Sequence, residues 1–419
     1  MKTKFKLVIL IFVCVLGCVY YFLFYKNNNL KFIPYNTDAV LIMDIKNIQN
    51  HYLKEILKNP TAWKFNIFTK DDDRISILNS GIEIPYFIQV FHLKNTSFAT
   101  WFSIFELNDS EKFLQFLKQE KFINKGKNIF QKDDICIKIN TENCLISYNS
   151  KMLELEKLNK YLSNKNSFTQ NVQSTQYLTN YAAGSFVFLD KNIKPIQIYF
   201  NRNTILFDNN NENLSKEFTK FYPNIFELNF NTDLLEKTKI FYNKYADLKF
   251  IDSLHLNNIH AEIHDVKQVK DSIITYNYDD NFNETKEVSF QKILQPLYSV
   301  TFSTENSKNL MDYFTKNEWI NNKNQFVKIP FQPNFTTVSS NNILISTEKI
   351  AKGKVKNSAI NYFFFTNSNT YLWNELHFLS MENKKKITFL ESIHFINKNN
   401  EYFLKIQFKE NNLPWILEL

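Results

Sequence analysis

The sequence predicts an α+β protein with a large, mainly antiparallel β-rich body that follows an N-terminal transmembrane helix. Three observations indicate this class. Short segments alternate apolar and polar residues, as a sheet with one buried face requires. Few long helical patterns separate these segments, which disfavours a parallel doubly wound sheet. Part of the chain also recurs about 197 residues later, so the body is expected to be a diverged tandem duplication of a strand–helix–strand–strand unit.

The N-terminal segment carries the clearest pattern. Residues 7–25 form a run of 19 residues without a charge, which as a helix spans a hydrocarbon layer of about 30 Å. Lys2, Lys4 and Lys6 precede the run. Because positive charge favours the cytoplasmic side, we expect residues 1–6 to be a cytoplasmic tail and the body to be periplasmic. The prediction is a single-pass inner-membrane protein whose signal-anchor contacts the lipid bilayer.

Two alternatives concern the same segment. A cleaved signal peptide has a shorter apolar run and small residues at its cleavage site, whereas this run continues into Tyr20–Tyr25. Val15–Cys18 resembles the lipobox of bacterial lipoproteins, in which Cys18 would be acylated. The residues after Cys18 are bulky and apolar rather than a polar tether, so the uncleaved anchor is preferred and the lipoprotein remains the alternative.

The body divides into a spacer and two repeats. Residues 26–36 form the spacer, residues 37–213 the first α+β repeat and residues 214–419 the second. The polar run before Leu214 suggests the boundary, since no Gly/Ser/Pro-rich linker divides the chain.

Hydrophobic periodicity places the elements of the first repeat in order. We expect a strand over Ala39–Ile45, helices over Asn47–Leu57 and Asp71–Leu78, strands over Tyr86–Lys94 and Phe98–Leu107, a helix from Asn108–Ser110, and a hairpin over Ile135–Tyr148. Further strands are predicted at Ser185–Leu189, Ile196–Phe200, Thr204–Phe207, Ile259–His264, Asp271–Tyr278, Val288–Ile293, Ile387–Phe395 and Tyr402–Lys409.

The repeat rests on two ungapped matches. Trp101–Asn124 aligns on Tyr298–Asn321 at an offset of 197, with apolar positions of the helix falling on apolar positions. Leu145–Ser147 then falls on Leu344–Ser346 at an offset of 199. The same elements therefore occur in the same order in both halves.

Composition excludes several functions. The five glycines are scattered singly, so no loop can cradle a phosphate with bare backbone, which removes the P-loop, the dinucleotide fingerprint and the nucleophile elbow. Nucleotide binding is not expected. Residues 1–31 hold five lysines and no acid, so the net charge of +8 leaves only +3 for the body. The body therefore carries no basic signal for nucleic acid.

The best metal candidate is the stretch His260–His264. It departs from the zincin pattern, in which Glu directly follows the first His on a helix. On a strand, His260, Glu262 and His264 share one face, but the two histidines lie about 13 Å apart, too far to hold one ion. Only neighbours such as His260 and Glu262 could ligate together. We expect a solvated strand face and no metal or cofactor.

Other candidates are also interpreted as structural. Asp71–Asp73 suits a helix N-terminus and Asp279–Glu284 a hairpin tip, since neither provides the glycine of a calcium loop. In the predicted hairpin Cys136 faces Ser147 and Cys144 faces Ile139, so the thiols are expected to be free and half-buried. No His stands in a recognisable setting with a Ser or Cys nucleophile, and no catalytic residue is predicted.

Residues 1 to about 117 resemble the start of uncharacterised single-anchor bacterial envelope proteins. The resemblance rests on Ile33–Pro34, Asp38–Ala39 and the strand–helix order around them. It implies location and architecture, and no activity.

These patterns predict a non-enzymatic protein that serves as a scaffold, assembly factor or chaperone-like tether for another envelope protein. The alternative is a binding module for a lipid, glycan or peptide in an aromatic-lined groove between the repeats. A third hypothesis is an enzyme whose carboxylates meet only in the folded chain. A flat exposed aromatic patch would favour the scaffold.

Overall fold

A computed structural model describes most of the body of the chain. The described residues are 20–21, 24–58, 75–150, 158, 173–189, 193–209, 224–231, 256–278, 282–329, 334–348, 360–367 and 387–409. The chain divides into two compact units, Met1–Asn210 with Ile416–Leu419, and Asn211–Trp415. The predicted division of the body, between Asn213 and Leu214, lies close to this boundary.

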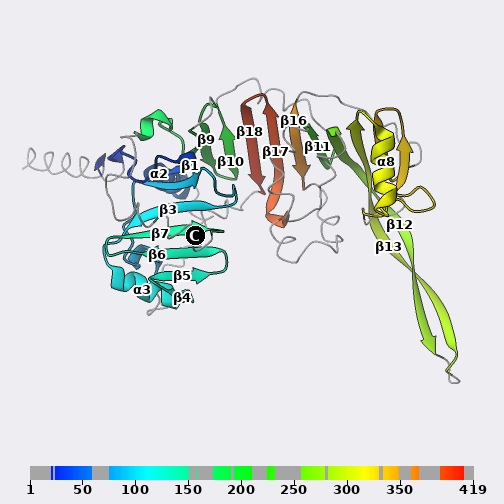
Figure 1. Cartoon of the computed structure of the whole chain (residues 1–419), viewed down its shortest axis with the longest axis horizontal. Helices are drawn as coiled ribbons and strands as arrows, with labels where there is room; N and C mark the ends of the chain where they lie inside the picture. Colours follow the sequence, from blue (N-terminus) through cyan, green and yellow to red (C-terminus); the bar gives the residue numbers. More distant parts are fainter. Residues whose placement is uncertain are drawn as a thin grey trace, which may run out of the picture. The chain divides into compact units, whose positions relative to one another are not determined.

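Among the described residues, unit 1 contains an antiparallel sheet and two α-helices of ten or more residues (Figure 1). Its elements are β1 (Thr37–Asp44), α2 (Ile45–Lys58), β2 (Phe87–Leu93), β3 (Trp101–Glu106), α3 (Ser110–Gln119), β4 (Ile123–Gly126), β5 (Ile129–Lys132), β6 (Ile135–Ile139), β7 (Asn143–Tyr148), β8 (Gly184–Phe188), β9 (Ile196–Asn201) and β10 (Thr204–Asp208). The pairings give the order β4-β5-β6-β7-β3-β2-β1-β8-β9-β10, with β1 near the centre.

Unit 2 has the same kind of architecture. Its elements are β11 (Phe226–Asn231), β12 (Leu256–Tyr278), β13 (Glu284–Thr304), α8 (Ser307–Lys316), β14 (Phe335–Val338), β15 (Asn342–Ser346), β16 (Asn361–Thr366), β17 (Leu390–Lys398) and β18 (Glu401–Phe408). The pairings give the order β14-β15-β13-β12-β11-β16-β17-β18. If β11 is matched to β1, every one of these pairings has its counterpart in unit 1.

The two helices that follow β3 and β13 are built alike. Asp109 caps α3 by accepting a hydrogen bond from the Lys112 N–H, and Asn306 caps α8 by accepting one from the Asn309 N–H. Such side-chain caps satisfy N–H groups that have no partner in the first turn of a helix. The offset of 197 that aligns the two sequences also superposes the first residue of α3, Ser110, on the first residue of α8, Ser307.

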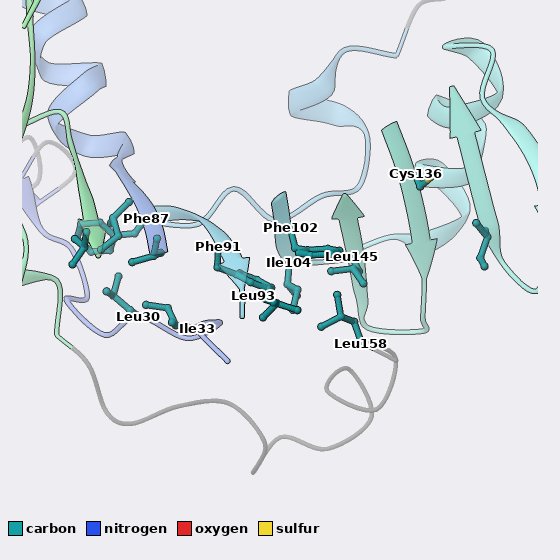
Figure 2. Packing of buried hydrophobic residues seen from close by; sticks show 14 residues of the cluster. Leu30, Ile33, Phe87, Phe91, Leu93, Phe102, Ile104, Cys136, Leu145 and Leu158 are labelled. Atoms are coloured by element: carbon teal, nitrogen blue, oxygen red, sulfur yellow. The ribbon is translucent and has the colours of Figure 1, made fainter. Parts of the chain in front are cut away.

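Each unit has its own hydrophobic core. In unit 1, Val40 and Ile42 of β1 are fully buried in a cluster with Phe91 and Phe102, whose ring centroids lie 6.0 Å apart (Figure 2). In unit 2, Leu310 and Phe314 of α8 pack on β13 and β15 in a second cluster. The buried residues of that cluster are Leu256, Tyr298, Leu310, Phe314, Ile320, Phe326, Ile343 and Ile345. Burial of these side chains supplies the main stabilisation of each sheet.

The α+β class is wrong, because the structure is mostly antiparallel β-sheet. Among the described residues, only α2, α3 and α8 are α-helices of ten or more residues. The described part of the predicted helix Asp71–Leu78 contains only the start of a 3₁₀ turn, Ile77–Asn79. The strands predicted at Ile259–His264 and Asp271–Tyr278 are one continuous strand, β12. A strand satisfies its backbone N–H and C=O groups by pairing with a neighbouring strand, and β12 is paired in this way along its whole length.

The predicted transmembrane anchor is also contradicted. Within the part of the chain that the structure describes, no helix is long and apolar enough to cross a membrane. The anchor over residues 7–25, the lipid-bilayer partner, the single-pass topology and the inner-membrane location are therefore corrected. Residues 7–19 and 22–23, and with them Cys18 of the lipoprotein alternative, lie outside the described residues.

Two glycines with positive φ provide a matched test of unit 1. Gly81 has φ +91° and a Cβ built on it would lie 2.1 Å from the Asp109 carbonyl oxygen, whereas Gly126 has φ +87° and open space around it. We expect Gly126→Ala to lower the free energy of unfolding by about 1 kcal/mol, the strain of a left-handed alanine. We expect Gly81→Ala to lower it by about 3 kcal/mol, because the clash adds to that strain. Urea unfolding followed by circular dichroism measures both, and equal losses would contradict the close approach.

Candidate functional site

A long β-hairpin extends from unit 2. Strands β12 and β13 contain 23 and 21 residues and remain paired from Leu256–Thr304 to Tyr278–Glu284. Neighbouring strands cover only its base, since β11 pairs with Asn258–Ile263 and β15 with Ser299–Ser303. We call the remainder, Asp265–Tyr278 with Glu284–Leu297, the arm. Figure 1 shows it extending beyond the rest of unit 2, and no described strand pairs with it.

The two faces of the arm differ in polarity. The cross-strand pairs Ser272–Phe290, Ile274–Val288, Tyr276–Lys286 and Tyr278–Glu284 share one face. The large apolar residues of this face, which we call the apolar face, are Ile274, Tyr276, Tyr278, Val288 and Phe290, and their exposed fractions are 45, 59, 69, 45 and 73%. In the outer part of the arm, beyond the Asp271–Gln291 pair, the opposite face carries mainly polar residues: Thr275, Asn277, Thr285, Glu287 and Ser289. Ile273 is the single large apolar residue in this part of the face.

The apolar face continues a buried face of the sheet. On β13, Phe302, Val300 and Tyr298 point to the core under α8, and the same alternation leads outward to Phe290 and Val288. At the base this face is covered, whereas on the arm it is exposed. The exposed pair Lys270–Lys292 lies on this face between the base and Phe290. Beyond it, a cluster of exposed apolar residues of this kind is typical of an interaction site.

The charges on the arm cancel. Its described residues carry four lysines and four acids, namely Lys267, Lys270, Lys286, Lys292, Asp265, Asp271, Glu284 and Glu287. The arm therefore offers a partner mainly apolar and aromatic area, together with unpaired strand edges, rather than a field of one sign.

A polar cluster lies on the other face at the base of the hairpin. Glu227 of β11 is directly opposite Glu262 of β12, and His260 shares their face. One ligand atom from each of the three side chains lies within 4.8 Å of the others. His260 and Glu227 are buried, with exposed fractions of 3 and 6%. The predicted solvated face is therefore wrong for His260, because β11 and β13 flank this part of β12.

His264 does not belong to the cluster. The pairing of β12 with β13 shifts by one residue between Ile263 and Asp265, which makes His264 the extra residue of a β-bulge. Its side chain is exposed. The structure thus brings together His260 and Glu262, as a neighbouring pair on a strand allows, and leaves His264 apart.

Three further side chains hold the carboxylates of the cluster. The Tyr362 hydroxyl of β16 donates to Glu227 Oε1 at 2.7 Å, and the Asn224 amide donates to Glu227 Oε2 at 2.8 Å. The Ser299 hydroxyl donates to Glu262 Oε1 at 3.1 Å. Burial, followed by its hydrogen bond to the Glu227 carboxylate, raises the pKa of the Tyr362 phenol well above its usual range, so it remains a donor at neutral pH.

In an Asp–His–Thr arrangement in unit 1, the threonine hydroxyl donates to the backbone rather than to the histidine. His92 Nδ1 lies 2.5 Å from Asp38 Oδ1, and His92 Nε2 lies 3.2 Å from Thr96 Oγ1. His92 Nε2 also lies 3.1 Å from the Ser97 carbonyl oxygen, and the Thr96 hydroxyl donates to the Leu93 carbonyl oxygen at 2.8 Å, so its proton is directed at the backbone. A general base needs an acceptor nitrogen facing the nucleophile. These contacts instead anchor the turn after β2.

The remaining candidates from the sequence either have structural roles or lie outside the described residues. Asp71–Asp73 and residues 279–281 are outside the described residues, while Glu284 begins β13. Cys136 and Cys144 are free, and the predicted pairing of Cys136 with Ser147 and Cys144 with Ile139 is confirmed. Both are buried rather than half-buried, and burial raises the pKa of the Cys144 thiol to about 12.

The described tryptophans pack inside their units. The Trp101 ring lies at a tilt against His92 and Phe186, and Trp319 lies against Phe314 and Phe326. These contacts fit the interpretation of single aromatic residues as core. The aromatic-lined groove between the repeats stays a prediction.

Sequence reasoning missed the length of the arm and the contribution of Glu227. The sequence predicts a hairpin tip at Asp279–Glu284 between short strands, but not that these strands continue to Leu256 and Thr304. Nothing near Glu227 in sequence indicates His260, because the two meet only through the register of β11 with β12.

A buried histidine makes the stability of unit 2 depend on pH. His394 of β17 lies against Phe364, with ring centroids 4.7 Å apart, and opposite Lys405. Burial, with a smaller contribution from Lys405, lowers the pKa of His394 from 6.5 to about 4. Between these two values the unfolded chain binds a proton that the folded chain does not, so the free energy of unfolding falls as the pH falls.

We expect His394 to account for a loss of roughly 3 kcal/mol between pH 7 and pH 4. Replacement by glutamine, which does not titrate, removes this contribution. Urea unfolding of wild type and His394→Gln across this range measures it. Parallel pH profiles for the two proteins would contradict the assignment.

The chain was also compared with known proteins. No protein-family model, curated protein or solved structure matches it. The resemblance of the N-terminal quarter to envelope proteins therefore remains an expectation, and any function must be argued from the arm and the polar cluster themselves.

Proposed function

We propose that this chain is a non-enzymatic scaffold or assembly factor that binds another protein through the arm. The observation that carries the proposal is the apolar face, where Ile274, Tyr276, Tyr278, Val288 and Phe290 are exposed together on one side of a two-stranded ribbon. A flat exposed aromatic patch is the feature that distinguishes a docking surface from a ligand cavity.

The exposed side chains are of the types that dominate protein interfaces. Tyr276, Tyr278 and Phe290 combine large contact area with few rotatable bonds, and aromatic residues are enriched among the positions that contribute most to binding. Isolated two-stranded ribbons are only marginally stable in water. A partner that covers the apolar face therefore also stabilises the arm.

The chemistry of the arm defines the partner. The balanced charges exclude strong electrostatic selection, so the partner is expected to present an apolar groove or sheet face. The outer edges of β12 and β13 on the arm offer backbone N–H and C=O groups to an extended strand of that partner.

A photocrosslinking residue placed on the arm tests the contact directly. We expect the crosslinker at position 276, on the apolar face, to capture a protein in living cells, whereas the same residue at the neighbouring position 277 captures little, because it lies on the opposite face. Mass spectrometry identifies the product. A product at twice 50.0 kDa that contains only this chain would identify a second copy as the partner. Equal capture from both positions, or none from 276, would contradict the proposal.

A pair of double variants measures the energetic contribution of the apolar face. Tyr276→Thr with Phe290→Thr removes two aromatic rings but keeps residues that favour strands, and we expect it to weaken binding of the crosslinked partner at least tenfold. Thr275→Ser with Asn277→Thr alters the other face and should bind within about twofold of wild type. Titration by surface plasmon resonance gives both values. Similar affinities for the two variants would count against docking by the apolar face.

A further inference from the structure

We propose that Glu227, His260 and Glu262, at the base of the arm, form a binding site for a divalent transition metal ion. Zinc is the ion that we expect there. This inference is independent of the proposed protein-binding function. It rests on the geometry of three buried or half-buried side chains on two adjacent strands, β11 and β12.

The separation of His260 Nε2 and Glu227 Oε1 is compatible with binding of both atoms to one metal ion. His260 Nε2 lies 3.3 Å from Glu227 Oε1. A strong N–H···O hydrogen bond is shorter, with a usual length of about 2.9–3.0 Å. Zinc bonds of about 2.0–2.1 Å in tetrahedral geometry place neighbouring ligand atoms about 3.3 Å apart. The imidazole and the carboxylate are thus spaced like two corners of a zinc tetrahedron.

The charges of the cluster also call for a cation. Glu227 and Glu262 lie directly opposite each other, an arrangement that destabilises a sheet when both are ionised. The Asn224 amide approaches Oε2 of both, at 2.8 Å from Glu227 and 3.3 Å from Glu262. A divalent ion would balance both carboxylate charges, and the neutral imidazole is the form that binds metals.

A second observation points to a ligand beside His260. Thr301 of β13 lies directly opposite His260, and Asn258 precedes it by two residues, so both share its face. Thr301 Oγ1 and Asn258 Oδ1 are buried and have no hydrogen-bond partner among the described residues. Buried oxygens of this kind are costly unless they are satisfied. Water bound to an ion at His260 would supply donors to them.

The surrounding hydrogen bonds position the carboxylates as a second layer of a metal site does. The Tyr362 hydroxyl donates to Glu227 and the Ser299 hydroxyl donates to Glu262, so a hydrogen bond orients each carboxylate. One imidazole with two carboxylates favours zinc over magnesium or calcium, which take oxygen ligands. Since the ligands come from β11 and β12, the ion would fasten the strand that forms the arm to its neighbour in the sheet.

Zinc binding by the full-length, tag-free chain tests the site after removal of metals with a chelator. We expect isothermal titration calorimetry to show one bound zinc ion per chain, and elemental analysis after desalting to retain it. His260→Ala and Glu262→Gln should each weaken zinc binding at least tenfold. His264→Ala is the matched control and should bind like wild type, because His264 lies in the bulge outside the cluster.

A second measurement keeps the test decisive if a variant folds poorly. Co²⁺ added to the folded wild-type chain should give the visible absorption of tetrahedral cobalt, and one equivalent of zinc should abolish it. Stoichiometric zinc should also raise the melting temperature of wild type and His264→Ala, as binding to the folded state requires. The proposal is overturned if folded wild type takes up no zinc, or if folded His260→Ala binds zinc as tightly as wild type does.

Discussion

The antiparallel pairing of β12 with β13 is the interaction on which the organisation of unit 2 depends. At its base the pair lies between β11 and β15, so one face packs under α8 and the other carries the polar cluster. Further out the same pairing continues without a third described strand, and the face that was core becomes the exposed apolar face of the arm. One register therefore produces both the candidate metal site and the candidate docking surface.

The bulge at His264 connects these two regions. Because successive residues of a strand point to opposite faces, one extra residue exchanges the faces on β12 but not on β13. Ile263 before the bulge and Ile274 beyond it lie on the same side of the hairpin although their sequence positions differ by an odd number. Without the bulge, the apolar residues of the outer β12 would lie on the polar side.

Both units form the same strand order with few glycines. Their matching strand order places a capped helix after β3 and after β13, and each helix is followed by a residue with positive φ, Lys121 in one unit and Glu318 in the other. Of the ten described non-glycine residues with positive φ, five are asparagines: Asn95, Asn128, Asn149, Asn324 and Asn399. Asparagine tolerates this conformation better than most residues, which agrees with an Asn-rich chain that has only five glycines.

The sequence by itself determined the local features. Alternation placed β1, β2 and β3 and the register of the hairpin that contains Cys136 and Cys144, and the cap-like residues placed the start of α3, because these signals act over a few residues. The fold class and the transmembrane anchor that it predicted are wrong. Only the tertiary structure decided that Glu227 meets His260 and Glu262, and that two predicted strands are one long β12 whose outer part is bare. These outcomes depend on which strands pair and where the pairing ends, and strand pairing joins residues that are far apart in sequence.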